Sequence, residues 1–440
     1  MPQVLSGGDR SLSRRVALAF SRESSLVLTP EEINREKPVL EIGENGSRSL
    51  MNQLRVAIVC DLVEEGWPSM DLVAEMLLDH LGREHSEVIV AKMICPPMRR
   101  RFTRHRNSNG KRFNADRFIN RFWDYPHFAR RLLSEFDLFH VIDHSYGQLV
   151  HELPSERTVI TCHDLDTFQC LLEPAHEPRS IFFRKMMNRS LSGFRRAARV
   201  TCDSVATRTQ LLARDLVPAE RAVVVPNGVH PSCSPDPHPT ADAQAAKMLG
   251  PGSNEQIDLL HVGSTIPRKR IDVLLKVFSG VRDVLPSARL LHVGGAFTAE
   301  QSEILTELRL HESVLVLPKV GRDILASLYR RAALVLLPSE REGFGLPIVE
   351  AMACGTPVVA SDLDVLREVG GSAATYCPVG EVAAWSQSVT EMLRLRCTDE
   401  RQWDKLRTAG ITQAAKFTWS EYASRMVNIY KSLATAGGSH

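Results

Sequence analysis

Two glutamates flank a glycine-rich turn late in the chain, in the run Glu342-Gly-Phe-Gly-Leu-Pro-Ile-Val-Glu350. The apolar residues 334–337 precede it without polar alternation, which predicts the end of a strand that is buried on both faces. The two glycines allow a tight turn, and Pro347 suits the first position of a helix. The free amides of residues 344–348 and the positive end of the helix dipole would then face one spot, which is a site for an anion.

The residues of this turn fit one class of ligand. A phosphate would bind the amides of Phe344, Gly345 and Leu346, and the carboxylates of Glu342 and Glu350 would accept hydrogen bonds from hydroxyl groups beside it. A nucleoside-diphosphate sugar carries both kinds of group. Each part alone has a simpler explanation, because a glutamate in a first helical turn complements the dipole and Gly-x-Gly marks a turn. Their combination indicates a sugar-nucleotide site.

The run from Glu342 to Glu350 resembles the Glu-x7-Glu signature of the family 4 retaining glycosyltransferases, and Gly355-Thr-Pro-Val358 agrees with that family as well. The resemblance implies an α/β GT-B fold, with two Rossmann-like domains whose parallel sheets face each other across a cleft. It implies a mannosyltransferase-like enzyme that moves a hexose-type sugar from a nucleoside-diphosphate sugar to a glycan, lipid-linked or polysaccharide-precursor acceptor, with retained anomeric configuration. Glu350 would hold the ribose hydroxyls, and Glu342 would orient the donor sugar.

A second element supplies positive charge. Gly263-Ser-Thr-Ile-Pro-Arg268-Lys269-Arg270 resembles the family element whose lysine contacts the donor diphosphate, and Lys269 is the matching position, with Arg268 beside it. Many members carry arginine directly after the glycine, where this chain has Ser264, so either Arg268 supplies the charge or the donor site is weaker. Such a cluster by itself predicts a solvated loop. Its place after a strand, where ligands of α/β sheets bind, favours a binding role.

Two further segments match the family less closely. His163 ends a predicted strand. A lone histidine is more often structural, but the resemblance implies one that faces the reacting sugar, to bond a hydroxyl or stabilise developing charge. Val320, with Lys319, resembles the backbone that lines the nucleobase pocket, although an amphipathic helix starting at Asp323 explains the same residues. The polar cluster 143–146 follows another strand, and we interpret it as acceptor-side.

The stretch Arg99–Arg131 combines many basic residues with seven aromatic ones and only two acidic ones. Nucleic acid, an anionic lipid surface or a lipid-linked or anionic acceptor would suit such a composition, and so would a solvated basic loop. A net charge of +2 argues against wholesale nucleic-acid binding. The loop 65–68 lies where many relatives have a glycine-rich, donor-contacting loop, but it holds a single glycine, Gly66.

Strands and helices alternate from Leu54 onward, which predicts βαβ units and parallel sheets. We expect a disordered extension over 1–52, with Met51 as a candidate translation start. We also expect an acceptor-side domain over 53–235, a nucleotide-sugar-binding domain over 250–415 and a helix over 416–436 that, by the resemblance, crosses back to the first domain. The predicted strands are 55–61, 87–93, 137–143, 158–163, 199–203, 222–226, 257–262, 289–293, 314–317, 334–337, 357–360 and 374–377.

Composition sets the remaining expectations. With 43% apolar and 24% charged residues, the chain has the composition of a soluble globular protein. Its nine cysteines are irregularly spaced, which indicates reduced thiols, and no apolar run approaches the ~18 residues of a membrane span. We expect a cytoplasmic protein, peripheral on the inner face of the membrane if residues 99–131 bind anionic lipid. We expect no metal and no cofactor besides the donor substrate.

Two other classes of function stay open. One is a different GT-B enzyme, such as a sugar-nucleotide epimerase or a phosphorylase-like protein, for which donor turnover without an acceptor would be diagnostic. The other is a non-catalytic scaffold that binds sugar nucleotides. The presence of Glu342, Glu350 and Lys269 argues against the scaffold, whereas Ser264 keeps it open.

Overall fold

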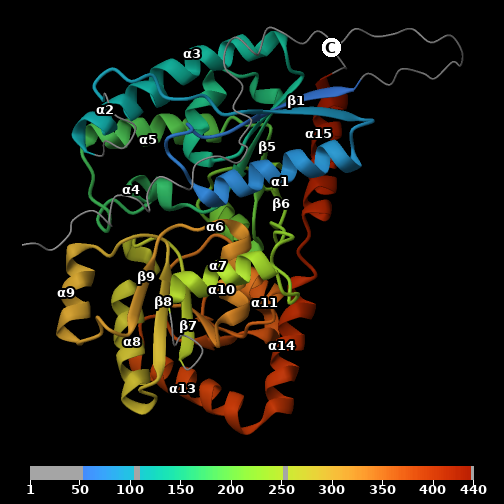
Figure 1. The fold of residues 1–440 in the computed structure, drawn as a ribbon. Coiled ribbons are helices and arrows are strands. Elements are labelled where there is room, and N and C mark those ends of the chain that lie inside the picture. Colours follow the sequence, from blue (N-terminus) through green and yellow to red (C-terminus); the bar gives the residue numbers. More distant parts are fainter. Residues whose placement is uncertain (1–52, 104–109, 251–255, 438–440) are drawn as a thin grey trace, which may run out of the picture. The chain divides into compact units, whose positions relative to one another are not determined.

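The computed structural model describes residues 53–103, 110–250 and 256–437, and it contains two six-stranded sheets in which every strand pair is parallel (Figure 1). All twelve predicted strands are present, so the α/β prediction is confirmed, whereas the expectations for residues 1–52 lie outside the described residues. The strands are β1 (Leu54–Val59), β2 (Ile89–Ile94), β3 (Leu138–Val141), β4 (Thr158–Cys162), β5 (Arg199–Cys202), β6 (Ala222–Val224), β7 (Ile257–Val262), β8 (Ala288–Val293), β9 (Val314–Leu317), β10 (Leu334–Leu337), β11 (Val358–Ser361) and β12 (Thr375–Cys377).

Each sheet is wound in two directions from a point between two of its inner strands. The first has the order β2-β1-β3-β4-β5-β6, and the second has the order β12-β11-β10-β7-β8-β9. The direction of winding therefore reverses between β1 and β3 in the first sheet and between β7 and β10 in the second. At such a reversal the connections leave toward opposite sides, and ligands of α/β sheets bind there, outside the carboxyl ends of the strands.

Helices connect the strands and cover the sheets. In the part of the chain around the first sheet they are α1 (Pro68–Glu84), α2 (Lys111–Ile119), α3 (Tyr125–Ala129), α4 (Gln169–Leu172), α5 (Ile181–Phe194) and α6 (Val205–Ala213). Around the second sheet they are α7 (Pro239–Leu249), α8 (Ile271–Val284), α9 (Ala299–Glu307), α10 (Arg322–Arg331), α11 (Leu346–Ala353), α12 (Asp364–Gly370), α13 (Val382–Thr398) and α14 (Glu400–Ala414), and α15 (Trp419–Gly437) ends the described chain. None of the helices in the described ranges is long and apolar enough to cross a bilayer.

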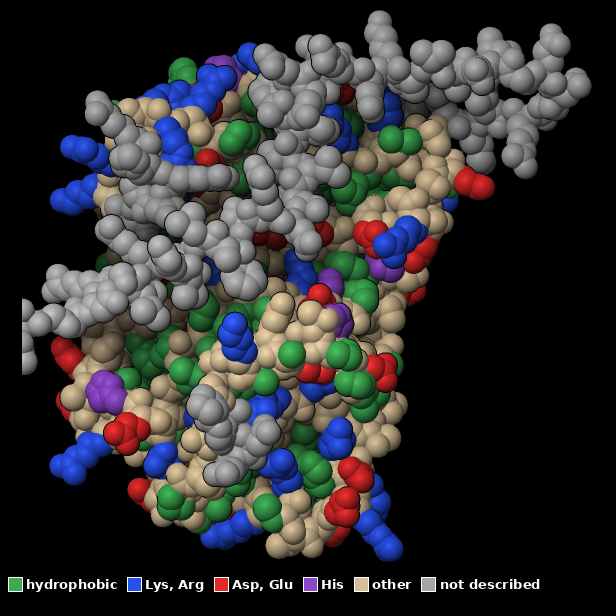
Figure 2. All heavy atoms as spheres, in the orientation of Figure 1, with side chains coloured by type: hydrophobic (Ala, Val, Ile, Leu, Met, Phe, Trp, Pro, Cys, Tyr) green, Lys and Arg blue, Asp and Glu red, His purple; other side chains and the backbone are tan. Residues whose placement is uncertain are grey.

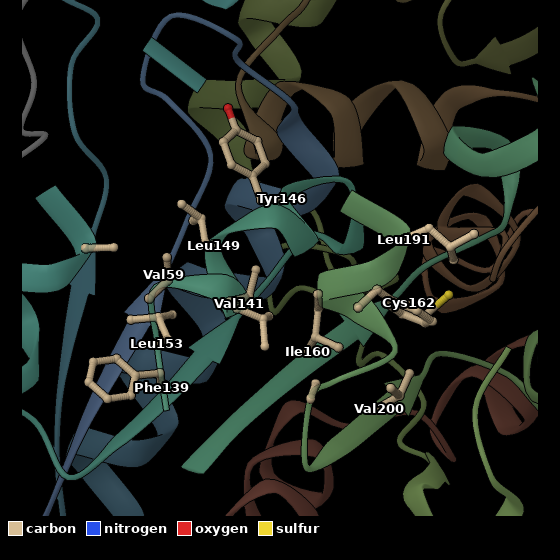
Figure 3. Close-up of a cluster of buried hydrophobic side chains, with 14 of the residues drawn as sticks. Val59, Phe139, Val141, Tyr146, Leu149, Leu153, Ile160, Cys162, Leu191 and Val200 are labelled. Atoms are coloured by element: carbon tan, nitrogen blue, oxygen red, sulfur yellow. The ribbon is translucent and has the colours of Figure 1, made fainter. Parts of the chain in front are cut away.

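Apolar strands explain why the sheets are buried on both faces. In the first sheet, side chains of β3, β4 and β5 such as Phe139, Ile160 and Val200 meet Leu149, from the 3₁₀-helical segment His144–His151, in one core cluster (Figure 3). All of β10 is buried, as its apolar run predicts. The burial of entire strands fixes their carboxyl ends, which several of the predicted site residues follow.

The basic and aromatic stretch is helical from Lys111 onward, so its interpretation as a solvated loop is wrong for that part, whereas residues 99–103 are not helical. It forms α2, a π-helical turn over Asn120–Asp124, and α3. Asp116 is buried and accepts hydrogen bonds from the backbone amides of residues 101–103. Arg101 donates two hydrogen bonds to the Asp124 carboxylate, at 2.7 and 2.8 Å. Part of the positive charge is therefore neutralised within the stretch itself.

The final helix, α15, packs against α1 and against residues of the first sheet in one apolar cluster (Figure 1). The segment that leads into α15 runs beside the connection that joins the first sheet to the second. The Val229 amide donates to the Phe417 carbonyl at 3.0 Å, and a Cβ added at Gly228 would lie 2.4 Å from the backbone nitrogen of Trp419. The two connections therefore touch each other at a position that only glycine can occupy.

Two buried tyrosines of α15 differ in their hydroxyl groups, and this difference predicts their effect on stability. The Tyr430 hydroxyl hydrogen-bonds the buried His140 Nδ1 at 2.7 Å, whereas the Tyr422 hydroxyl has only a weak interaction with Thr161 and no hydrogen bond of normal geometry in the described part of the chain. We expect Tyr430→Phe to lower the free energy of unfolding by about 1–3 kcal/mol, because the imidazole nitrogen would be left unpaired. Denaturant titration should show a change within about 1 kcal/mol for the control, Tyr422→Phe; equal losses in both variants would contradict the assignment.

Candidate functional site

The glycine-rich turn before α11 adopts a conformation that depends on its glycines. Gly345 has a φ of 91°, in the left-handed region, and α11 begins at Leu346, so Pro347 is its second residue. The Ile348 amide donates to the Gly345 carbonyl at 2.9 Å. The prediction that residues 344–348 all present free amides is therefore wrong for Ile348, and Pro347 has no N–H. The amides of Phe344, Gly345 and Leu346 remain as the candidates for binding an anion.

Glu342 joins the turn to the basic element after β7. Its Oε1 accepts hydrogen bonds from Lys269 Nζ at 2.5 Å and from Ser339 Oγ at 2.7 Å, and its Oε2 lies 3.4 Å from Arg268 Nη1. Burial alone would raise the pKa of Glu342, but Lys269 and then Arg268 outweigh it and hold the pKa below its ordinary value. The structure thus brings together the first glutamate and both cations that the sequence assigned to the donor diphosphate.

Arg268 also contacts the loop that follows β4 in the first sheet. Its Nε lies 2.6 Å from Asp166 Oδ2, and its Nη2 lies 3.5 Å from Asp164 Oδ2. Burial would lower the pKa of Arg268, and the carboxylates of Glu342, Asp164 and Asp166 together raise it. The guanidinium is therefore shared among three carboxylates, and it links the ends of strands from both sheets.

Glu350 lies in the second turn of α11 and is buried, with 9% of its surface exposed. Its Oε2 accepts a hydrogen bond from the Tyr329 hydroxyl at 2.9 Å. Burial raises the pKa of Glu350, although this hydrogen bond opposes the shift. Tyr329 comes from α10, and the segment Val320-Gly321 leads directly into that helix. Glu350 and Val320 therefore belong to adjoining elements of the second sheet's carboxyl edge.

Val320 is half-buried against the apolar core around the second sheet. The Lys319 ammonium group donates to the Gly66 carbonyl at 3.3 Å, and Arg322 pairs with Glu75 of α1 at 2.7 Å. The helix expected from Asp323 is present as α10, one residue earlier. The segment thus meets the loop 65–68, in which Gly66 has a φ of 57°.

His163 is fully engaged by its own surroundings. Its Nδ1 lies 2.6 Å from Asp203 Oδ2, and its Nε2 lies 2.8 Å from the Ile142 carbonyl oxygen. Both acceptors lack hydrogens, so both ring nitrogens must donate and the imidazole carries a positive charge. Burial would lower the pKa of His163, but Asp203 above all outweighs it, and the pKa rises to about 9. The ring could contact a sugar only after one of these bonds breaks.

The backbone of His163 contacts the glycine-rich turn directly. A Cβ added at Gly343 would lie 1.7 Å from the His163 carbonyl oxygen, so this position requires glycine. The Gly343 carbonyl accepts hydrogen bonds from the hydroxyls of Ser204 at 2.9 Å and Thr207 at 3.2 Å. Beside them, the Glu368 carboxylate of α12 accepts from the Val205 and Ala206 amides at the start of α6. The turn is therefore held from the first sheet's side as well.

The acceptor-side cluster 143–146 is buried at the end of β3. Asp143 accepts hydrogen bonds from the amide and the hydroxyl of Ser145. The ring of Tyr146 lies 4.2 Å below the guanidinium of Arg121, which also pairs with Glu65 at 3.7 Å. Arg121 therefore lies at the ends of the strands. The sequence analysis treated residues 99–131 as a surface stretch and did not predict this position.

Sequence reasoning missed three buried polar residues: Asp203 and Tyr329, which form the hydrogen bonds described above, and Asp61, which follows β1. Asp203 and Asp61 each follow a buried strand of the first sheet, so a polar residue directly after an apolar strand was the available signal. Tyr329 gave no such signal, because it lies on the buried face of a helix.

Comparison with known proteins fits this geometry. A family model described as "Glycosyl transferases group 1" matches residues 250–411, and one described as "Glycosyltransferase Family 4" matches residues 71–232. O-antigen chain mannosyltransferase B of Escherichia coli is 30% identical over 296 residues, which are 65% of this chain and 72% of that protein. The chain belongs to the family 4 glycosyltransferases. A D-inositol 3-phosphate glycosyltransferase of Thermobispora bispora is 29% identical over 53% of this chain, and the match spans 56% of its own length.

Solved structures establish the fold of this glycosyltransferase. Sucrose-phosphate synthase from Thermosynechococcus elongatus matches with a TM-score of 0.67 at 20% identity, over 87% of this chain and all of that one. Anabaena Alr3699/HepE, in complex with UDP and glucose, matches with a TM-score of 0.66 at 17% identity, over 86% of this chain and all of that one. With two parallel six-stranded sheets, the predicted GT-B fold is confirmed.

The ion pair between His163 and Asp203 predicts a pH-dependent stability for this glycosyltransferase. Unfolded His163 loses its proton near its ordinary pKa of 6.5, whereas the folded protein keeps it to about 9. The pair's contribution is therefore fully present below pH 6.5 and is lost as the pH rises through about 9. We expect the loss of stability in Asp203→Asn, measured by denaturant titration, to be larger at about pH 6 than at about pH 9.5.

Asp362→Asn is the matched control, because Asp362 pairs with Arg367 at the surface and contacts no histidine among the described residues. Its effect on the free energy of unfolding should be nearly constant over the same range. A constant effect of Asp203→Asn as well would contradict the charged state assigned to His163.

Proposed function

We propose that this glycosyltransferase transfers a hexose from a nucleoside-diphosphate sugar to a hydroxyl of a glycan, lipid-linked or polysaccharide-precursor acceptor, with retained configuration. The observation that carries the proposal is the convergence of Lys269 and Arg268 on Glu342, beside the start of α11. Two cations and a helix N-terminus at one point form a site for a diphosphate. The relatives of this chain include mannosyltransferases, which supports a hexose donor.

Each site residue has a role in this proposal. Lys269, Arg268 and the amides of residues 344–346 would bind the diphosphate and stabilise the charge that develops as it leaves, without requiring a metal. Because both cations are paired with carboxylates in the structure, donor binding would transfer them from Glu342 and its neighbours to phosphate oxygens. Glu342, once released, would accept hydrogen bonds from the donor sugar.

The remaining roles follow from position. Glu350, with one oxygen bonded to Tyr329, would accept hydrogen bonds from the ribose hydroxyls, and the backbone at Val320 would line the nucleobase. His163 would place a positive charge near the reacting sugar. Its backbone carbonyl, which lies against Gly343, would also face that part of the site. The contacts of Gly343 with Ser204 and Thr207 would exclude water from the reacting bond, which suppresses hydrolysis of the donor.

A thermal-shift experiment with a panel of nucleoside-diphosphate sugars tests the donor site. We expect one donor to raise the melting temperature of the wild type, since a ligand at a hundredfold excess over its dissociation constant stabilises the fold by about 2.7 kcal/mol. Lys269→Ala and Glu350→Gln should lose most of this shift, and Lys276→Ala, an exposed lysine of α8, should keep it. A wild type that no donor stabilises, or a shift kept in both site variants, would contradict the proposal. Donor conversion without any acceptor would instead favour an epimerase.

We also propose that the region around α2 and the start of α5 binds an anionic membrane surface. Trp123, Ile181 and Phe182 are 64%, 76% and 62% exposed, and the rings of Phe118 and Phe182 lie 5.2 Å apart, which joins the two segments. The same two segments also carry exposed basic residues: Lys111, Arg112, Arg179, Arg184 and Lys185. Lys and Arg side chains protrude where α2 and α3 lie (Figure 2). Exposed apolar and basic side chains together suit the boundary of an anionic bilayer.

Vesicle flotation tests this second proposal. Wild-type protein should float with phosphatidylserine-containing vesicles and not with pure phosphatidylcholine, and added salt should weaken the association. The double variant Ile181→Ser and Phe182→Ser should reduce the floated fraction at least about threefold, because it removes exposed apolar area. Val284→Ser, at an apolar position on α8 that is 47% exposed, is the control. Flotation that is the same on both kinds of vesicle would contradict the proposal.

A further inference from the structure

Asp61 is buried at the end of β1 without a compensating partner. The residue is 5% exposed, and neither carboxylate oxygen has a hydrogen-bond partner among the residues that the structure describes. Its backbone is held in place, because the Asp61 carbonyl accepts from Cys95 Sγ at 3.1 Å. Buried carboxylates are normally paired or hydrogen-bonded, so one with two free oxygens requires an explanation.

The surroundings of Asp61 are acidic. Burial raises the pKa of Asp61 well above its ordinary value, and the nearby carboxylates of Asp143 and Glu65 raise it further, against the opposing charges of Arg121 and His163. The Asp143 carboxylate is already bonded to Ser145. Asp61 is therefore the member of this group whose oxygens are left to accept new hydrogen bonds.

The nearby cations have other partners. Arg121 donates to the Ser145 carbonyl, pairs with Glu65 and lies over the ring of Tyr146, although its Nε has no hydrogen-bond partner among the described residues. His163 donates to Asp203 and to the Ile142 carbonyl. Neither one forms an ion pair with Asp61 within the described residues, although both could have compensated its charge.

His144 is a second buried group with free hydrogen-bonding capacity. The residue is 3% exposed, and within the described ranges neither ring nitrogen forms a hydrogen bond, although Nδ1 lies 3.4 Å from Asp143 Oδ1 and Nε2 lies 3.8 Å from Asp164 Oδ1. The ring nitrogens can both donate and accept. Asp61 and His144 thus leave unpaired polar groups at the ends of adjacent strands, β1 and β3.

The topology gives these groups a functional position. Asp61 and Asp143 follow β1 and β3, between which the winding of the first sheet reverses. In the second sheet the equivalent reversal, between β7 and β10, carries Lys269 and Glu342, the residues assigned to the donor. A ligand site of the first sheet is expected at the same topological point, outside the carboxyl ends of the strands.

We propose that Asp61 and His144, which follow the adjacent strands β1 and β3, bind hydroxyl groups of the acceptor, and that the acceptor is a neutral, hydroxyl-rich ring such as a sugar or cyclitol at this point. A carboxylate accepts hydrogen bonds from two hydroxyls, whereas a phosphate placed here would face Asp61 and Asp143. Asp61 is then a specificity-determining residue, which also explains a buried carboxylate that the fold does not pair. The inference rests on the proposed glycosyl transfer.

The variant Asp61→Asn keeps the shape of the side chain and removes its charge, and Asp258→Asn is the matched control. Asp258 is equally buried, but it pairs with Arg289 at 2.8 Å and with Arg331 at 2.9 Å. We expect Asp258→Asn to lower the melting temperature, since it breaks a buried ion pair, and Asp61→Asn to leave it equal or higher. A purely structural Asp61 would give a lower melting temperature instead.

The kinetic arm uses methyl α-D-mannopyranoside and myo-inositol as neutral probes and D-inositol 3-phosphate as a phosphate-bearing one, with the donor found by thermal shift. In the wild type, a neutral probe should accelerate release of the nucleoside diphosphate. In Asp61→Asn the KM for that probe should rise at least about tenfold while the donor-induced thermal shift persists; one bidentate hydroxyl contact is worth about that much. Asp258→Asn should keep its KM within about twofold.

The outcomes separate the two proposals. A wild type without a donor-induced shift means that the proposed function fails, and this inference fails with it. If the shift is present, then an unchanged KM in Asp61→Asn, acceleration by the phosphate-bearing probe alone, or no acceleration by either neutral probe overturns this inference and leaves the donor site standing.

Discussion

The buried carboxylate of Glu342 sets the main constraint on this molecule. A negative charge at 7% side-chain exposure is stable only if positive groups lie in contact with it, and Lys269 and Arg268 meet that need from the loop after β7. Their position in turn determines where that loop lies. Through Asp164 and Asp166 the same charges reach the end of β4, so one buried anion organises strand ends of both sheets.

The two points at which the winding reverses carry groups of different charge. The second sheet presents cations and backbone amides, which suit a diphosphate, and the first presents Asp61, Asp143 and His144, which suit hydroxyl groups. A transfer reaction needs both, because one substrate carries the leaving phosphate and the other carries the attacking hydroxyl. Arg121 and His163 bring positive charge to this end of the first sheet, but each is paired with an acidic side chain, Glu65 and Asp203 respectively.

The strands could be predicted from the sequence because each is a short apolar run with a turn or helix after it, and β10 is the plainest case. The proximity of Lys269 and Glu342 could not be derived from pattern alone. They are 73 positions apart and meet only because β7 and β10 are neighbours, so their prediction depended on family resemblance. The pairing of His163 with Asp203 was missed for the same reason, since it requires β4 beside β5. The charge of residues 99–131 was misjudged for another reason. Composition counts charges, but it does not show that Arg101, Arg117 and Arg121 each have an acidic partner.

The contact between the two chain connections, at Gly228 and Trp419, has a mechanical consequence. Two separate connections could each change conformation without affecting the other. Here the Val229 amide bonds the Phe417 carbonyl and the backbones touch at Gly228, so neither connection can shift at this point without displacing the other. A larger side chain at position 228 would push the two backbones apart, and it would therefore disturb both connections at once although it belongs to neither candidate site.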